Sequence, residues 1–160
     1  ARAGVAKGLL YHYFGGRRGF YLATVTDVID GMVAAMSAGQ EEGDAPLIGL
    51  LTGFLGYVEE NADIYQALVR GGLGADPEVC AQLDRVKRFA IHRLVGEAEI
   101  DALQRIQLVG WIAWIETATS SWLDTTGVSA DLFLETAHAS LAAALVAVLG
   151  ATAPPAGAKR

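Results

Sequence analysis

The stretch Gly4–Arg18 reads GVAKGLLYHYFGGRR and predicts a short basic helix with a turn on each side. Gly4 provides the positive φ that ends a preceding helix at little steric cost, and Val5 fills the angle between the two helices. Residues Lys7–Phe14 then predict the second helix, with one apolar face that packs and one face left free for a partner. The pattern is that of a helix-turn-helix.

This stretch resembles the recognition helix of the TetR family of bacterial transcriptional regulators. The resemblance is carried by Ala3-Gly4-Val5, by Lys7–Phe14 with its Leu-Tyr-x-Tyr-Phe ending, by the basic Arg17 and by the aromatic-led helix that begins near Phe20. It implies a DNA-binding head of three helices, of which the first and most of the second would precede Ala1. A long helical region follows the motif here, as it does in the family.

Two positions depart from the family pattern. The residue after Gly-Val is usually Ser or Thr, whose oxygen caps the helix, whereas Ala6 has no such oxygen. This loss costs about 1 kcal/mol of helix-end stability. The Gly15-Gly16 pair is also looser than the usual turn, which contains Pro or Ser.

The resemblance implies which residues contact DNA. It puts four residues near base edges or the neighbouring phosphates, namely Lys7, Gly8, Tyr11 and His12, and two on phosphates, namely Tyr13 and Arg17. For the two tyrosines, ordinary helix packing is the alternative. A dimer would set two such helices in successive major grooves, so the implied partner is a roughly palindromic double-stranded DNA operator.

Charge is distributed unevenly along the chain. Residues 1–26 hold four basic and no acidic side chains, a charge of +4, while the rest holds eight basic and eighteen acidic side chains, a charge of −10, in agreement with the net −6. A basic end on an acidic body is typical of a protein that touches phosphate with one end only. A solvated basic terminus is the alternative.

The 160 residues suffice for a sizeable core, and 52% of them are hydrophobic, with a mean hydropathy of +0.34. This surplus indicates apolar surface beyond the core, as in a dimer interface or a lined cavity. The single cysteine, Cys80, excludes an intrachain disulfide. Together with the lack of a visible signal peptide, this favours the reducing cytoplasm.

Helical periodicity, caps and the lack of strand-like alternation predict an all-α fold. The expected helices are Arg17 or Arg18 to about Ser37, Pro46–Glu60, a short helix capped by Asn61 and ending at Val69 or Arg70, one capped by Asp76 and reaching Leu94, Asp101–Thr125, and one capped by Ser129 and ending at Gly150. The first has an expected apolar stripe of Phe20, Thr24, Val28, Met32 and Ala35 or Met36. Ala38–Pro46 is expected to be a loop. We therefore expect the remnant of a helix-turn-helix head with its connecting helix (1–38), a helical ligand-binding and dimerisation domain (39–150) and a disordered tail (151–160).

The helix expected over Asp101–Thr125 is apolar nearly all round. One stripe holds Leu108, Trp111, Ile112, Ile115, Ala118 and Trp122, and a second holds Leu103, Ile106, Gly110, Ala113 and Trp114. A helix that is apolar on most sides must be covered on most sides. The family resemblance implies that the last two long helices pair with their copies as a four-helix bundle, which makes the protein a homodimer.

The resemblance also implies that the body encloses an apolar cavity for a small, apolar effector. The candidate lining residues are Phe54, Tyr57, Tyr65, Phe89, His92, Trp111, Trp114 and Glu116. For each aromatic residue the alternative is plain core packing. Glu116 lies on a mostly buried helix, where a carboxylate needs a partner, so we expect it to face the cavity or the dimer seam.

Metal, cofactor, catalytic and membrane roles find little support. Glu135 and His138 form one Glu-x-x-His, but di-iron bundles need this motif twice with two further Glu residues. Cys80 lacks an identifiable base, and the glycines sit at helix ends rather than in a nucleotide loop. The run Ala139–Leu149 is shorter than the roughly 20 residues of a membrane span. We expect no cofactor, no metal and no membrane partner.

The sequence therefore predicts a ligand-responsive, DNA-binding transcriptional regulator, a repressor that releases its operator when the effector binds, and not an enzyme. The alternative is a helical small-molecule-binding or enzymatic domain without specific DNA binding. If Ala1 is the true start, a further alternative is a dimerisation partner that cannot bind DNA.

Overall fold

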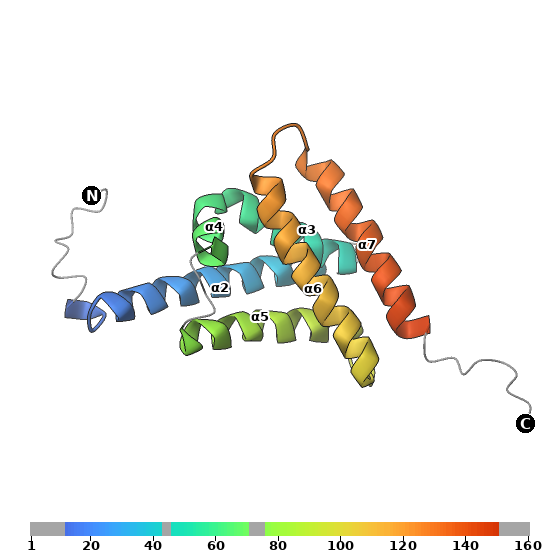
Figure 1. Cartoon of the computed structure of the whole chain (residues 1–160), viewed down its shortest axis with the longest axis horizontal. Coiled ribbons are helices and arrows are strands. Elements are labelled where there is room, and N and C mark those ends of the chain that lie inside the picture. Colours follow the sequence, from blue (N-terminus) through green and yellow to red (C-terminus); the bar gives the residue numbers. More distant parts are fainter. Residues whose placement is uncertain (1–11, 43–45, 71–75, 151–160) are drawn as a thin grey trace, which may run out of the picture.

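The computed structural model describes residues 12–42, 46–70 and 76–150, and the regular structure in these residues is helical. With the labels of Figure 1, the helices are α2 (Arg17–Glu42), α3 (Pro46–Glu60), α4 (Ala62–Arg70), α5 (Pro77–Val95), α6 (Ala102–Leu123) and α7 (Ala130–Gly150). The prediction of an all-α fold is confirmed. The predicted tail at 151–160 lies outside the described residues.

Helix α2 forms the long axis of the molecule (Figure 1). It makes its most extensive contact with α3, and α5 runs alongside it. Helices α6 and α7 pair with each other and are joined by a turn in which Gly127 adopts a φ of 89°. The start of α2 therefore projects away from the α6–α7 pair.

Local caps set several helix starts where the sequence predicts them. The Asp76 carboxylate accepts from the backbone N–H of Glu78 at 3.0 Å, with proline at the first helical position of α5. The Ser129 hydroxyl accepts from the backbone N–H of Leu132 at 3.3 Å at the start of α7. These three-residue signals act within one turn, so they do not depend on the packing of distant elements.

The start of α6 is capped and also tied to the end of α7. Asp101 and Gln104 form a reciprocal capping box, with distances of 2.7 and 2.8 Å between backbone nitrogen and side-chain oxygen. The buried Gln104 amide nitrogen also donates to the backbone carbonyl of Val148. One side chain therefore closes the open end of the α6–α7 pair.

Two boundary expectations are wrong. Helix α2 continues to Glu42 instead of ending near Ser37, so Ala38–Pro46 is not a loop throughout. Asn61 does not cap α4 with its side chain, because its amide donates back to the carbonyl of Tyr57 at 2.8 Å. Its backbone carbonyl continues the helical hydrogen bonding instead, so α3 passes into α4 with a single intervening residue.

The buried stripe of α2 also differs from the prediction at one position. Val28, Met32 and Met36 are buried as expected, whereas Thr24 is exposed and its hydroxyl donates to a carbonyl within α2. Val25 and Ile29 are buried in addition. They join a small cluster with α4 and α5, contacts that a single helix pattern does not reveal.

Helices α2 and α3 cross with their backbones in contact, which explains why α2 continues through Gly39. A β-carbon at Gly39 would lie 2.2 Å from the carbonyl oxygen of Gly49, and one at Gly49 would lie 1.9 Å from the carbonyl oxygen of Gly39. At Gly53 it would lie 2.1 Å from the carbonyl oxygen of Ala35. We call Gly39, Gly49 and Gly53 the glycine seam. Gly49 and Gly53 are four residues apart, so they lie on the same face of α3.

The core consists of two clusters of buried side chains. The larger is built mainly from α3, α6, α7 and the second half of α2, and it includes Leu51, Val58, Leu108, Ile112, Leu141 and Val148. The smaller lies nearer the start of α2 and contains Val25, Val28, Ile29, Leu68 and Val79. Tyr57 and Val86 pack against both clusters, so the two are continuous.

The first predicted stripe of α6 is buried, apart from the half-buried Ala118, and the second stripe is exposed in the single chain. We call the exposed apolar residues on the outward-facing sides of the last two helices the α6–α7 apolar stripe. It comprises Leu103, Ile106, Val109, Gly110, Ala113 and Trp114 of α6 and Leu132, Ala139, Ala142, Ala143 and Val146 of α7. Exposed fractions reach 67% for Ile106 and 73% for Val146. Several large apolar side chains exposed on one face of a helix indicate an interaction surface.

Two segments, Arg17–Gln40 and Ala130–Val148, have the length and hydropathy of a membrane span. The first carries exposed Asp27 and Asp30 on the outer side of α2, and Asp30 pairs with Arg85 of α5. The second packs along α6 and shares the core. Both helices therefore also pack against neighbouring helices of the bundle.

Candidate functional site

The start of α2 presents the described part of the predicted DNA-contacting surface. Lys7, Gly8 and Tyr11 lie outside the described residues. His12, Tyr13 and Arg17 are all exposed, and 83% of the Tyr13 surface is accessible. An exposed tyrosine beside an exposed arginine has the chemistry of a phosphate contact.

A short segment with two glycines connects the exposed residues His12 and Tyr13 to α2. Gly15 and Gly16 adopt φ angles of 67° and 113°, which L side chains rarely adopt. A β-carbon at Gly19 would lie 1.8 Å from the carbonyl oxygen of Phe14. The rings of Phe14 and Phe20 also meet edge to face at 5.4 Å. The double glycine, which departs from the family turn, thus supplies the two positive φ angles of the turn that leads into α2.

An apolar cavity lies in the body between α2, α3, α4, α5 and α6. Its volume is about 70 Å³. Its lining comprises Ile29, Met32, Met36, Leu50, Leu51, Phe54, Tyr65, Leu68, Val69, Leu83, Val86, Lys87, Ala90, Trp111, Ile112, Ile115 and Glu116. Five helices therefore supply its wall, and few of its groups are polar.

The structure brings four of the eight predicted ligand-binding residues together around this cavity. They are Phe54, Tyr65, Trp111 and Glu116. The rings of Phe54 and Tyr65 meet edge to face at 6.1 Å. Trp111 donates its indole N–H to the Ser140 hydroxyl at 3.1 Å, which ties this wall of the cavity to α7.

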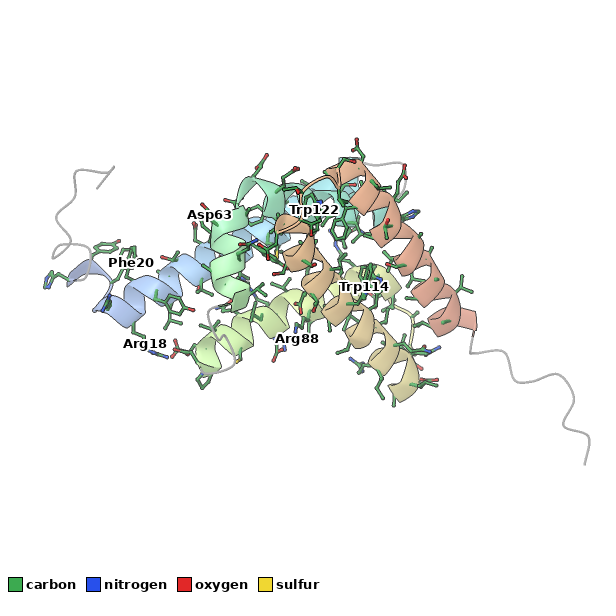
Figure 2. The ribbon with its side chains drawn as sticks, turned by 45° about the horizontal axis from the view of Figure 1, so that its top comes forward. Arg18, Phe20, Asp63, Arg88, Trp114 and Trp122 are labelled. Carbon is green, nitrogen blue, oxygen red and sulfur yellow. The ribbon has the colours of Figure 1, made fainter. Side chains whose placement is uncertain are left out.

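The other four predicted residues lie outside the cavity lining. Tyr57 packs against both core clusters, with its ring against Gly31 of α2. Phe89 lies under the Arg93 guanidinium at 5.5 Å. His92 lines a separate hollow, and Trp114 projects from the outer side of α6 with 40% of its surface exposed (Figure 2). Helical periodicity alone does not separate cavity-facing from outward-facing aromatic residues on helices that are apolar nearly all round.

Lys87 is the partner of Glu116 and was not among the predicted site residues. Its ammonium lies 3.4 Å from the Glu116 carboxylate, and both side chains are partly exposed and line the cavity. The sequence predicts that the Glu116 carboxylate has a partner, but it does not predict which residue this is. The identity of that residue depends on how α5 crosses α6, which the sequence does not reveal. Two basic residues of α5, Arg85 and Lys87, therefore form ion pairs with acidic residues of other helices.

Burial keeps the Tyr65 hydroxyl protonated above the pH at which a tyrosine ordinarily ionises. Its side chain is 3% exposed, and its hydroxyl donates to the backbone carbonyl of Glu116 at 3.4 Å. Burial raises the pKa of Tyr65 well above 10, and the nearby Glu116 carboxylate raises it further. The hydroxyl is thus a fixed hydrogen-bond donor in the cavity wall.

We expect Tyr65→Phe to lower the free energy of unfolding by about 1 kcal/mol at pH 7, because a buried hydrogen bond is lost. Above pH 10 the difference in free energy of unfolding between the two proteins should shrink, and at higher pH Tyr65→Phe should become the more stable one. The unfolded wild type loses the tyrosine proton there while the folded protein retains it, so wild-type stability falls by about 1.4 kcal/mol per pH unit. Urea unfolding of both proteins at pH 7 and at several values above pH 10 measures this. If the free energies of unfolding of the wild type and of Tyr65→Phe changed in parallel with pH, the prediction would be contradicted.

Ion pairs connect α5 to α2 at two points. Arg18, next to the exposed Arg17, lies 3.2 Å from Asp76 and 3.3 Å from Glu78, and Arg85 pairs with Asp30. Figure 2 shows Arg18 directed from α2 toward the start of α5. Hydrogen bonding to Arg18 lowers the pKa of Asp76 below its usual value. Helix α5 therefore both forms a wall of the cavity and holds the head-proximal end of α2.

The family profile described as the Tetracyclin repressor-like C-terminal domain matches residues 46–148, from the start of α3 nearly to the end of α7. The chain belongs to the TetR family of transcriptional regulators. The crystal structure of a TetR-family transcriptional regulator from Streptomyces coelicolor has the same fold, with a TM-score of 0.72 over 98% of this chain and 79% of that chain at 22% identity. No curated protein matches the chain.

TetR membership confirms the family inferred from the Gly4–Arg18 stretch, and it does so from a different part of the chain. The roles assigned to individual site residues remain predictions. In the described ranges no group of three His, Cys, Asp or Glu side chains could hold a metal ion. Glu135 and His138 are one turn apart on α7, and Glu135 is exposed.

Proposed function

We propose that this TetR-family protein is a dimeric, cytoplasmic repressor that releases a palindromic operator when a small apolar molecule enters the central cavity. The observation that carries the proposal is the double role of α5. Val86, Lys87 and Ala90 of this helix line the cavity, and its first turn holds Arg18 at the DNA-proximal end of α2. A change in the cavity thus has a direct mechanical route to the head.

The DNA-facing end is expected to bind phosphate with Tyr13 and Arg17 and to read bases with the preceding helix. Exposure of both side chains supports this, as does the +4 charge of residues 1–26. Lys7, Gly8, Tyr11 and His12 are the proposed contacts nearest to the bases. Phosphate contacts of this kind provide affinity and register, whereas base contacts provide sequence choice.

The effector is expected to be small and apolar, because the cavity wall is almost wholly apolar. Phe54, Tyr65 and Trp111 would contact it, and Lys87 and Glu116 would border it. At about 70 Å³ the cavity is smaller than the roughly 300–1,000 Å³ of pockets for drug-sized ligands, so binding requires the wall to move. The glycine seam holds α2 against α3, so the proposed movement is in the other walls, and α5 is the wall that also contacts Arg18 at the start of α2.

Dimerisation is proposed through the α6–α7 apolar stripe. Two copies of this stripe would form a four-helix bundle in which the exposed surface of each is covered. The alanines and Gly110 within the stripe let helices approach closely. A twofold dimer would present two DNA-facing ends, consistent with a palindromic operator.

Binding of the full-length protein to DNA flanking its own gene tests the proposal. We expect tight, site-specific binding that weakens as salt rises. Arg17→Ala and Tyr13→Ala should each weaken operator binding at least tenfold, and Arg17→Ala should reduce the salt dependence by about one counterion per subunit because a phosphate contact is lost. Fluorescence anisotropy of a labelled operator at two salt concentrations provides the measurement.

Arg105→Ala is the matched control, since it removes the same charge from an exposed position on α6 far from the DNA-facing end. It should leave operator affinity unchanged. Small apolar molecules are then titrated into the operator complex, and an effector should release the DNA. Weak, sequence-independent binding by the wild type would refute the regulatory role, and effector binding without a change in operator affinity would refute the response.

A further inference from the structure

A second hollow lies where α5 ends and α6 begins, and it is distinct from the central cavity. Its volume is about 230 Å³. Arg88 and His92 of α5 line it one turn apart, and Arg105 enters from α6. No residue lines both the hollow and the central cavity.

The cationic side chains of this hollow lack acidic partners, unlike their neighbours on α5. Lys87 and Arg85 form ion pairs with acids of other helices. Arg88 and Arg105, both described and exposed, form no ion pair and no side-chain hydrogen bond with any other described residue. Arg88 and Arg105 line the same hollow, and no described lining residue is a carboxylate, so the hollow favours an anion.

The nearby acids do not neutralise the hollow. Asp101 is committed to the capping box of α6, where its carboxylate accepts from a backbone N–H. Glu97 and Glu99, in the connecting loop, are exposed and do not belong to the lining. Asp84 lies one turn before Arg88 on α5 but forms no ion pair with it. Because the body as a whole is acidic, this hollow is a local exception.

Apolar side chains complete the wall and define the rest of the ligand. Ile91 and Val95 of α5 and Ile100 of the loop line the hollow beside the two arginines. The site therefore combines an anion-binding edge with an apolar surface large enough for a small ring or a branched chain.

We propose that this hollow binds a small amphipathic carboxylate. Arg88 and Arg105 pair with the carboxylate, the His92 ring donates a hydrogen bond to it, and Ile91, Val95 and Ile100 cover the apolar part. The ligand thereby bridges α5 and α6 at the end of α5 opposite Asp76. This inference does not rest on the proposed operator or on the central cavity.

Benzoate titrated into the full chain tests the proposal, with benzamide as the uncharged analogue of the same shape. We expect benzoate to bind and to shift the NMR signal of the His92 ring, which a His92→Gln variant identifies among the three histidines. Arg88→Gln and Arg105→Gln should each weaken benzoate binding at least tenfold, because a charged pair is lost. Benzamide should bind at least tenfold more weakly than benzoate.

Arg17→Gln is the control for charge, since it removes the same charge from the far end of α2, and it should leave benzoate affinity unchanged. Thermal unfolding of each variant confirms that the fold is retained, as expected for exposed arginines. Equal benzoate affinity in the wild type, Arg88→Gln and Arg105→Gln would overturn the proposal. So would benzoate binding that leaves the His92 signal unmoved, or an absence of benzoate binding at millimolar concentration.

Discussion

Gly49→Ala is expected to lower the free energy of unfolding by about 2 kcal/mol. The new β-carbon would lie 1.9 Å from the carbonyl oxygen of Gly39, and this neighbour is backbone, which cannot rotate away. Overpacking of this kind costs about 1–3 kcal/mol or more, and the better helix propensity of alanine returns only about 1 kcal/mol. Urea unfolding followed by circular dichroism measures the change.

Gly56→Ala provides the matched control in the same helix. Gly56 is exposed, and a β-carbon there meets nothing within 4 Å, so only the helix propensity acts. We expect it to raise the free energy of unfolding by up to about 1 kcal/mol. The two substitutions should therefore differ in sign. Equal effects of Gly49→Ala and Gly56→Ala would show that α2 and α3 do not pack through the glycine seam.

Ile106→Glu is expected to convert the proposed dimer into a monomer. The Ile106 side chain is 67% exposed in the single chain and lies within the α6–α7 apolar stripe. Twofold symmetry would bury two carboxylates in an apolar seam, and an unpaired buried charge costs several kcal/mol. The dissociation constant of the dimer should rise at least a hundredfold. Sedimentation equilibrium over a range of concentrations measures this constant.

Ala81→Glu adds the same charge to an exposed position on α5, outside the stripe. It should leave the dissociation constant unchanged, and neither variant should lose helical circular dichroism. A wild-type protein that sediments as a monomer, or an Ile106→Glu protein that still forms a tight dimer, would exclude this face as the interface. An intact dimer in Ile106→Glu would direct attention to another apolar surface.

Short stretches of the sequence predict much of the fold. The caps at Asp76, Asp101 and Ser129 each act within a single turn, so the sequence predicts where α5, α6 and α7 begin. The two stripes of α6 follow from a periodicity of 3.6 residues. The family, too, was predictable, because the Gly4–Arg18 motif is local.

The candidate site was predictable only in part, because a cavity is a property of several helices at once. Phe54, Tyr65, Trp111 and Glu116 line it, whereas Trp114, three residues after Trp111, faces outward. Both tryptophans lie on a helix that is apolar nearly all round. The side of α6 that meets α5 is decided by the crossing of the two helices.

Caps and helical periodicity act within a few residues, so the helical class, the family and most helix starts can be predicted from short stretches of the chain. That Gly39 continues a helix instead of ending one depends on packing, because the benefit of a missing β-carbon comes from the carbonyl of Gly49 on the opposite helix. Packing also sets the pairing of Lys87 with Glu116 and places Arg88 and Arg105 in the lining of one hollow, whose described lining residues include no acid. Such pairings join residues distant in the chain, and their distances are set by how whole helices pack.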